Sequence, residues 1–481
     1  MPVDPAYSPD PQFERLGPEF ADPVAPADFP SSLLRFRNDR HAAAVGLAGL
    51  TPAEWLDAFA RFTPLPRNQR APLALRYHGH QFRVYNPDLG DGRGFLFAQV
   101  RGACGRLLDL GTKGSGRTPW SRSGDGRLTL KGGVREVLAT ALLEALGVET
   151  SKSFSLIETG EALPRNDEPS PTRSAVLTRL SFSHIRFGTF QRLAVLEEPT
   201  LMAQLLEHVR QVYAPDLKWN DVEAAAVGFL DRSVRLSARL TAQWMAAGFV
   251  HGVLNTDNMN INGESFDYGP YRFLPRNDPN FTAAYFDHSG LYAFGRQPEA
   301  VFWNLQQLAG ALLTVAPESA LIGPLSAFQE VYRRELIAAI LKRLGLRSAG
   351  PDADAALAGA VFRALAAGGE RLRWEPFFFD FFCGAASSDR ALGGRRGALY
   401  REAAFDDFRA RLNDFDADRV DRLSSAYFKR EEPEELLIED IDRLWDPIAR
   451  DDDWSLFYAK LEGVETARQA YDLGAAPSAH A

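Results

Sequence analysis

Cysteine is almost missing from this sequence. Only Cys104 and Cys383 occur among 481 residues, which is too few for a disulfide framework or a cysteine-based zinc site. We expect both to be ordinary buried side chains, because an unpaired cysteine behaves as a small hydrophobic residue. The sequence therefore excludes small disulfide-stabilised domains and cysteine-rich zinc-binding folds.

Long hydrophobic runs and long basic runs are lacking as well. The longest apolar stretches, such as residues 42–50, are far shorter than the ~20 residues that a helix needs to cross a bilayer. Residues 1–5 lack the basic and apolar segments of a signal peptide. The net charge of −9 argues against binding to a phosphate backbone. We therefore expect a cytoplasmic monomer whose partners include no membrane and no nucleic acid.

Apolar side chains, by contrast, are abundant. They make up 45% of the chain, with 33 Phe and 8 Trp, and a chain of this length exceeds one typical core, so we expect two or three structural units. Short strand-like runs bounded by Gly, Pro and Asp come first. They cover residues 73–77, 94–100, 106–110, 153–157 and 174–179.

Helical periodicity separates and then replaces these strand-like runs. One helix over residues 134–146 interrupts them and ends before Gly147, a residue type that commonly follows a helix. After about residue 197 the apolar spacing is helical, with stripes over residues 227–245, 302–313 and 331–344. Gly248 and Gly345 follow the first and third of these stripes.

The C-terminal part has a less regular pattern. Residues 347–356, rich in Pro, Ala and Asp, predict a surface linker, and the aromatic run at 374–382 predicts core. A last acidic helix spans residues 437–448, and a small-residue tail that we expect to be disordered follows it. The patterns divide the chain into an N-terminal extension (1–65), a β-rich unit with one helix (66–195), a helical unit (196–346) and a helical C-terminal extension (347–481).

The stretch from His251 to Pro270 carries the clearest chemistry. An apolar helical pattern stops at Gly248, and an Asn-rich loop then presents Asp257 and Asn258. Nine residues later Asp267 stands in an Asp-Tyr-Gly turn. Mg²⁺ in phosphate-handling enzymes is usually bound by one or two protein oxygens together with substrate phosphates. Asn258 and Asp267 are therefore the predicted metal ligands.

This layout matches the kinase arrangement, in which a catalytic loop ends in a metal-binding Asn and a following Asp binds the other side of the metal. The His, Gly and Asn of that loop are present as His251, Gly252 and Asn258. The position of the catalytic Asp, however, holds Val253, which cannot accept a proton. The nearest replacement is Asp257, and we predict that it is the catalytic base.

Several blocks together resemble the selenoprotein O family of pseudokinase-fold protein adenylyltransferases, over about residues 77–309. The blocks, in the order of that family, are YHGHQF at 77–82, LGDGR at 89–93, KGSGRTP at 113–119, RE at 135–136, SHIRFG at 183–188 and HGVLNTDN at 251–258. The resemblance implies an α+β, protein-kinase-like two-lobed fold with a β-rich first lobe, a helical second lobe and extensions at both ends. The last hundred or so residues match the family less well.

The resemblance also implies an activity. AMP would pass from ATP to Ser, Thr or Tyr hydroxyls of proteins, with release of pyrophosphate and with Mg²⁺ or Mn²⁺ as cofactor. ATP would sit flipped relative to a kinase, so that its α-phosphate faces the hydroxyl and Asp257 takes the proton. UTP stays open as a second donor. Many members carry Cys or selenocysteine near the C-terminus, whereas residues 474–481 contain neither, so we expect no redox feature at that end.

Four further side chains are candidates for binding nucleotide. Lys113 and Glu136 follow the order of the strand Lys and helix Glu of kinases, although spacing alone favours a surface ion pair. Arg179 and Arg186 could both be solvated surface residues. The resemblance implies instead that Lys113 pairs with Glu136 and that both arginines reach the nucleotide phosphates, for which Arg is a suitable partner.

A Gly-Asp-Gly-Arg motif occurs twice, at 90–93 and at 124–127. Glycine lets backbone N–H groups approach phosphate oxygens, and Arg adds a bidentate donor; the alternative is a plain turn. The predicted nucleotide-binding residues of these motifs are Gly90, Gly92, Arg93, Asp125 and Gly126. A Walker A loop is rejected for the segment around Lys113, because the Gly-Lys-Ser/Thr ending is missing.

Two other functions stay open at this stage. The protein could be a nucleotide-binding pseudokinase scaffold without catalysis, or an ordinary phosphoryl-transferring kinase. The presence of both metal ligands and of the Lys113–Glu136 pair favours an enzyme over a scaffold. Val253 weighs against the kinase.

Overall fold

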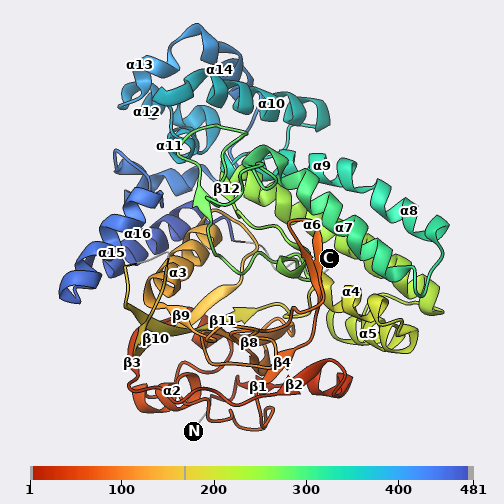
Figure 1. The fold of residues 1–481 in the computed structure, drawn as a ribbon. Coiled ribbons are helices and arrows are strands. Elements are labelled where there is room, and N and C mark those ends of the chain that lie inside the picture. The colour runs from red at the N-terminus through yellow and green to blue at the C-terminus, as the bar shows by residue number, and fades with distance from the viewer. Residues whose placement is uncertain (1–3, 167–168, 475–481) are drawn as a thin grey trace.

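The computed structural model describes residues 4–166 and 169–474 (Figure 1). The expectations about the first residues of the chain and about the small-residue tail fall in part on residues 1–3 and 475–481, which lie outside the described residues. The described part is a mixed α and β structure with one large antiparallel sheet and many helices.

Among the described residues, the largest sheet has nine strands, and all of its neighbours pair antiparallel. Its main path runs β2 (Ala21–Pro23), β4 (Leu73–Leu75), β7 (Leu96–Arg101), β8 (Leu107–Lys113), β11 (Thr172–Ser181), β10 (Lys152–Leu163) and β3 (Leu33–Arg37). Two short strands complete it, β1 (Ser8–Pro9) on β7 and β9 (Leu128–Thr129) on β11. The five predicted strands are confirmed, and the N-terminal extension adds β1, β2 and β3.

A helix covers each face of this sheet (Figure 1). On one face α2 (Pro52–Phe59), which starts with a Thr51/Glu54 capping box, stacks Trp55 on Phe154 of β10 with ring centroids 5.1 Å apart. On the other face lies α3 (Leu130–Ala145), the predicted helix. It approaches the sheet closely, because a Cβ on Gly133 would stand 2.4 Å from a methyl carbon of Leu156. The sheet therefore holds α3 in a fixed position.

The helical half follows, and the three predicted stripes are confirmed. They lie on α6 (Val222–Ala246), α7 (Gln297–Leu312) and α9 (Phe328–Arg343). Gly248 and Gly345 both have φ of 62°, a left-handed conformation that ends a helix without strain only at glycine. The remaining helices of this half are α4 (Phe187–Val195), α5 (Pro199–Tyr213) and α8 (Glu318–Ser326).

Two predictions for the C-terminal part are wrong. Residues 347–356 do not form a linker, because α10 (Pro351–Gly368) begins inside them. Pro351 suits the first helical turn. Asp354 in that turn accepts a hydrogen bond of 2.9 Å from the Ala349 N–H. The acidic helix, α15 (Ile438–Asp451), is not the last, since α16 (Ser455–Tyr471) follows it. Much of the buried face of α16 is small, including Ala467 and Ala470, so its apolar pattern is weak.

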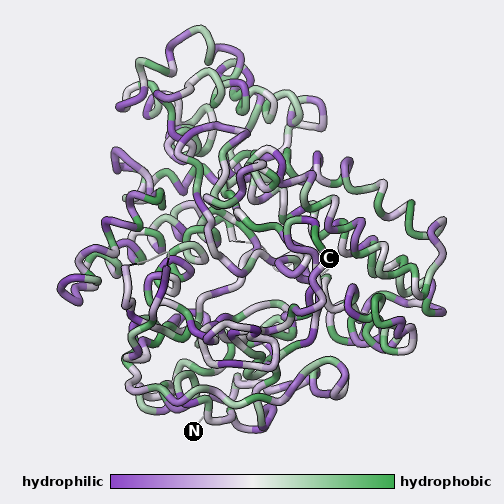
Figure 2. The backbone as a smooth tube through the Cα atoms, in the orientation of Figure 1, coloured by the Kyte–Doolittle hydropathy of each residue, from purple (hydrophilic) through white to green (hydrophobic). Residues whose placement is uncertain are grey.

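The aromatic run is core, as predicted. It forms α11 (Trp374–Asp380), and its rings are buried against α10 and α14 (Asp406–Leu412). Two short helices, α12 (Ser388–Gly393) and α13 (Gly397–Tyr400), complete this region. In Figure 2 the hydrophobic stretches concentrate in the interior, around α6 and α7, and α15 at the periphery is mostly hydrophilic.

The two cysteines differ in exposure. Cys383 is buried, as expected, whereas Cys104 is exposed. Cys104 stands in the turn between β7 and β8, where the Gly105 N–H donates to the Gly102 carbonyl, and a tight turn at a sheet edge offers no core to pack against. Across the described residues, no helix is long and apolar enough to cross a membrane.

Candidate active site

A cavity of about 500 Å³ opens between the sheet and the loop that follows α6. It falls within the range of about 300–1,000 Å³ that is usual for small-molecule sites. The structure brings eleven of the twelve predicted site residues to its wall, namely Gly90, Gly92, Arg93, Lys113, Asp125, Gly126, Arg179, Arg186, Asp257, Asn258 and Asp267. The twelfth, Glu136, lies behind Lys113.

Lys113 and Glu136 form a buried ion pair. Lys113 is the last residue of β8, and its Nζ lies 2.7 Å from Oε2 of Glu136 on α3 and 3.2 Å from Oδ1 of Asp267. The Glu136 side chain is fully buried. A surface ion pair is thereby ruled out, and α3 fixes where the ammonium group of Lys113 points.

Asp267 is surrounded by cations. Besides Lys113, Nη1 of Arg179 lies 3.1 Å from its Oδ1 and Nη1 of Arg186 lies 3.1 Å from its Oδ2. Burial alone would raise the pKa of Asp267, but Lys113, Arg179 and Arg186 outweigh it and hold that pKa well below its usual range. Asp267 also has φ of 65°, an uncommon conformation for a residue other than glycine. It is therefore an ionised carboxylate in a fixed place at the cavity wall.

Asp257 has a contrasting environment. It lies in the 3₁₀ turn η2 (Thr256–Asn258), its side chain is buried, and its Oδ1 has no hydrogen-bond partner within the described part of the chain. Burial raises its pKa to about 6, against the opposing effect of Arg186. Arg186 binds the main chain here, because its Nη1 donates to the Asp257 carbonyl over 2.6 Å. Oδ1 of the carboxylate therefore stays available to accept a proton.

Asn258 and His251 are both held by backbone groups. Nδ2 of Asn258 donates to the Val253 carbonyl over 2.9 Å, which leaves its Oδ1 as the available ligand atom. His251 is buried, and its Nε2 lies 2.9 Å from the Phe266 carbonyl. Since a carbonyl only accepts, Nε2 carries the proton, and burial lowers the pKa of this imidazole. His251 thus supports the turn before Asp267 and does not line the cavity.

The two Gly-Asp-Gly-Arg motifs meet along one wall of the cavity. A Cβ on Gly90 would lie 2.4 Å from the Trp120 ring, and one on Gly126 would lie 2.3 Å from the Gly116 backbone. Glycine is required there by packing within the wall. Asp125 is bound by Arg165, with Nη1 and Oδ2 2.7 Å apart.

Further residues of the wall were not predicted. They are Tyr77, Gln81, Leu89, Asp91, Gly94, Thr112, Trp120, Ser121, Arg122, Gly124, Arg127, Arg165, Val253, Asn255, Gly269 and Pro270. Arg122 and Arg165 matter most among them, because they add positive charge to the site. With them, seven cationic and four anionic side chains line the cavity. Arg122 stands two residues before the second Gly-Asp-Gly-Arg motif, a signal that the sequence did offer. Arg165 has no such marker.

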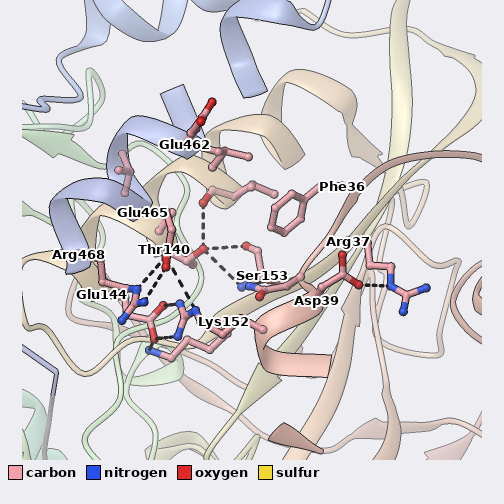
Figure 3. Close-up of a pocket in the computed structure, with 16 residues that line it drawn as sticks. Phe36, Arg37, Asp39, Thr140, Glu144, Lys152, Ser153, Glu462, Glu465 and Arg468 are labelled. Carbon is pink, nitrogen blue, oxygen red and sulfur yellow. Dashed lines mark hydrogen bonds and ion pairs between the residues drawn. The ribbon is translucent and has the colours of Figure 1, made fainter. Parts of the chain in front are cut away.

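A second cavity, of about 390 Å³, lies between α3, α16 and the start of β10 (Figure 3). Its four cationic side chains are matched by four anionic ones. Glu144, for example, lies 3.3 Å from Nζ of Lys152, and Glu465 lies 2.6 Å from Arg468. This cavity contains none of the predicted residues and has no excess positive charge for a triphosphate.

Metal binding by the protein alone is not supported. Within the residues that the structure describes, no group of three or more His, Cys, Asp or Glu side chains could hold a metal ion. Asn258 and Asp267 nevertheless fit an ion that takes its other ligands from phosphates and water, because one offers a free amide oxygen and the other an ionised carboxylate.

A positively charged cavity with a buried carboxylate at its wall suits an enzyme that handles a nucleotide triphosphate, and comparisons with known proteins identify its family. The family model "Protein adenylyltransferase SelO" matches residues 6–465. The chain belongs to this family. It is therefore a protein adenylyltransferase, which uses ATP to transfer AMP to protein hydroxyls. The match also extends well beyond residues 77–309, so the expected loss of similarity in the last hundred residues is wrong.

Relatives in several organisms agree with this family. A protein of Gloeobacter violaceus is 47% identical over 467 residues, which is 93% of each chain. One of Trichormus variabilis is 41% identical over 473 residues, 95% of each chain, and one of Synechocystis is 50% identical over 384 residues, 78% of each. All three are named "Protein nucleotidyltransferase YdiU".

Proposed function

We propose that ATP binds with its phosphates along the cationic wall and its α-phosphate towards Asp257. The observation that carries this proposal is the Asp257 carboxylate, which is buried, free of hydrogen bonds at Oδ1, and next to a cavity with three more cationic than anionic side chains. A triphosphate carries up to about four negative charges, for which buried guanidinium groups are suitable partners.

In the proposed reaction Asp257 takes the proton of the acceptor hydroxyl as its oxygen attacks the α-phosphorus. A new phosphorus–oxygen bond forms, and the bond between the α-phosphate and the departing pyrophosphate breaks. Lys113, Arg179 and Arg186 stabilise the charge on the transferring and leaving groups. Glu136 acts only by orienting Lys113, because it is fully buried behind it.

A divalent cation, Mg²⁺ or Mn²⁺, would be held by Asn258 and Asp267. When bound, such an ion neutralises phosphate charge and fixes phosphate geometry. Gly90, Gly92, Arg93, Asp125 and Gly126 would form the wall that contacts the rest of the nucleotide. In that wall Arg93 is exposed and can reach a ligand without breaking a buried contact.

The architecture we infer is a kinase-like one of two lobes. Residues 66–195 would form the first lobe and residues 196–346 the second, with residues 1–65 and 347–481 as extensions. The location of the cavity between the sheet and the loop after α6 supports this layout. We further propose a monomer that works in the cytoplasm on proteins and on no nucleic acid or membrane. The net charge of −9 supports the absence of a nucleic-acid partner.

ATP labelled separately at the α- and γ-phosphates tests the proposal. We expect label on protein only from the α position, both in the wild type and after Val253→Asp, since an added carboxylate at the kinase position does not turn the γ-phosphate towards the acceptor. Efficient γ-label transfer by Val253→Asp would mean that ATP binds in the kinase orientation, and the proposed pose would be wrong.

The rate of transfer should depend on pH through Asp257. Burial raises its pKa to about 6, and a base works only when deprotonated. Activity should therefore be constant above about pH 7 and fall about tenfold per unit below pH 6. Initial rates from about pH 4.5 to 8 at saturating ATP, with ATP affinity measured in parallel, would check this. A rate that is flat across pH 6 would exclude Asp257 as the base.

A further inference from the structure

An exposed apolar patch lies beside the catalytic loop. Val84 is 70% exposed, Tyr285 80% and Phe286 42%. The ring of Phe286 lies between two others, with centroid distances of 5.8 Å to Phe82 and 5.1 Å to Tyr285. We call Phe82, Val84, Tyr285 and Phe286 the docking patch. Clustered exposed hydrophobic side chains mark interaction sites, whereas isolated ones need no explanation.

Half of the docking patch stands on a hairpin, β5 (Gly79–Gln81) and β6 (Val84–Asn86), that is bound to the catalytic loop. The His80 N–H donates to Thr256 Oγ1 over 2.7 Å, and the Phe82 N–H donates to Asn255 Oδ1 over 3.0 Å. A Cβ on Gly79 would lie only 3.4 Å from Cβ of Asp257. The hairpin therefore passes directly beside the proposed base, with little room for a side chain at position 79.

The tip of this hairpin is strained. Phe82 has φ of 50° and Arg83 of 64°, a left-handed turn normally made by Asn and Gly. The patch residue Phe82 is thus displayed at a conformational cost. Such strain persists only where surrounding contacts enforce it, and it clusters at functional sites.

The other half of the patch stands on an ordered loop. Buried Asp287 accepts hydrogen bonds from the Leu291 N–H over 2.9 Å and the Tyr292 N–H over 2.8 Å. The Tyr292 hydroxyl donates to the same Asn255 Oδ1 that binds Phe82, over 2.8 Å. Asn255, which lines the cavity, therefore joins both halves of the patch to the site.

We propose that the docking patch binds an apolar or aromatic side chain next to the acceptor hydroxyl of a protein substrate. This rests on the proposed function, in which the hydroxyl must reach Asp257. The patch adjoins the cavity near Asp257, because Gln81 and Asn255, which line the cavity, precede and bind the patch residue Phe82. Its occupant is thus the substrate protein.

Acceptor peptides test this proposal. Two synthetic peptides would share one Ser, Thr or Tyr acceptor, one flanked by Leu and Phe and the other by Ser and Gly at the same positions. The wild type should use the apolar peptide about tenfold or more efficiently in kcat/KM, since burial of one large apolar side chain is worth at least that factor. Val84→Ser and Tyr285→Ser should remove the preference and leave ATP affinity unchanged.

Ile322→Ser on α8 is the matched control, because Ile322 is 55% exposed and outside the docking patch; it should keep the preference. If the wild type used both peptides equally, or modified neither, the docking proposal would be wrong. Transfer of the α-label to other proteins would still leave the proposed function intact. Loss of a wild-type dimer in Val84→Ser or Tyr285→Ser, measured by sedimentation, would identify the patch as a contact between copies of the chain and would also overturn the docking proposal.

Discussion

Asp257→Asn is expected to slow AMP transfer about 10²–10⁴-fold, the usual loss when a general base is removed, with little change in ATP affinity. Asparagine keeps the size of the side chain and cannot take a proton. The contact of Arg186 survives, because Arg186 binds the main-chain carbonyl of Asp257. Single-turnover transfer from α-labelled ATP and calorimetric ATP binding would separate chemistry from affinity.

Glu264→Gln provides the matched control. Glu264 is also a buried carboxyl group, and burial raises its pKa to about 8, but it does not line the cavity. Its Oε2 accepts from the Phe182 N–H over 2.9 Å, a contact that glutamine can keep. Transfer should be unaffected. Asp257→Asn with a near-normal rate would exclude the base, and an equal loss of ATP affinity would make Asp257 a binding residue.

The catalytic loop was predictable because its chemistry is local in sequence. Asp257, Asn258 and Asp267 lie within eleven residues, and the helix that precedes them ends at a glycine. The strands that position Lys113 and Arg179 were also predictable, since short apolar runs between turn residues are typical of a sheet. Eleven of the predicted residues consequently share one cavity.

The contacts made across the fold were not predictable in the same way. A helical wheel places Glu136 opposite the main apolar stripe of α3, which suggests exposure, yet Lys113 and Arg179 cover it, with Arg179 Nη1 3.6 Å from its Oε1. Arg165 joins the wall from residues that carry no motif. Such side chains are brought to the site by tertiary packing, which overrides local pattern.

A second large loss is expected from Asp267→Asn. Of the two proposed metal ligands, Asn258 is neutral and Asp267 carries a charge. Transfer in Mg²⁺ should therefore fall on the order of 10²–10³-fold, in line with several kcal/mol of charge stabilisation. Asn258→Ala should cost less, because a neutral amide contributes less to holding a cation. Transfer rates in Mg²⁺ would show which of the two variants loses more activity. Their melting temperatures would show whether either variant is destabilised.

Asp267 is also the anion shared by Lys113, Arg179 and Arg186. Its replacement should therefore have a second effect, on ATP binding without metal. Removing its charge takes one anion away from the three cations and leaves their other contacts in place, so ATP binding without metal should persist or strengthen in Asp267→Asn. Added Mg²⁺ should no longer increase affinity. A structural role alone would weaken binding with and without Mg²⁺ and lower the melting temperature. Near-full transfer in Mg²⁺ would show instead that the protein ligand of the cation lies elsewhere in the cavity.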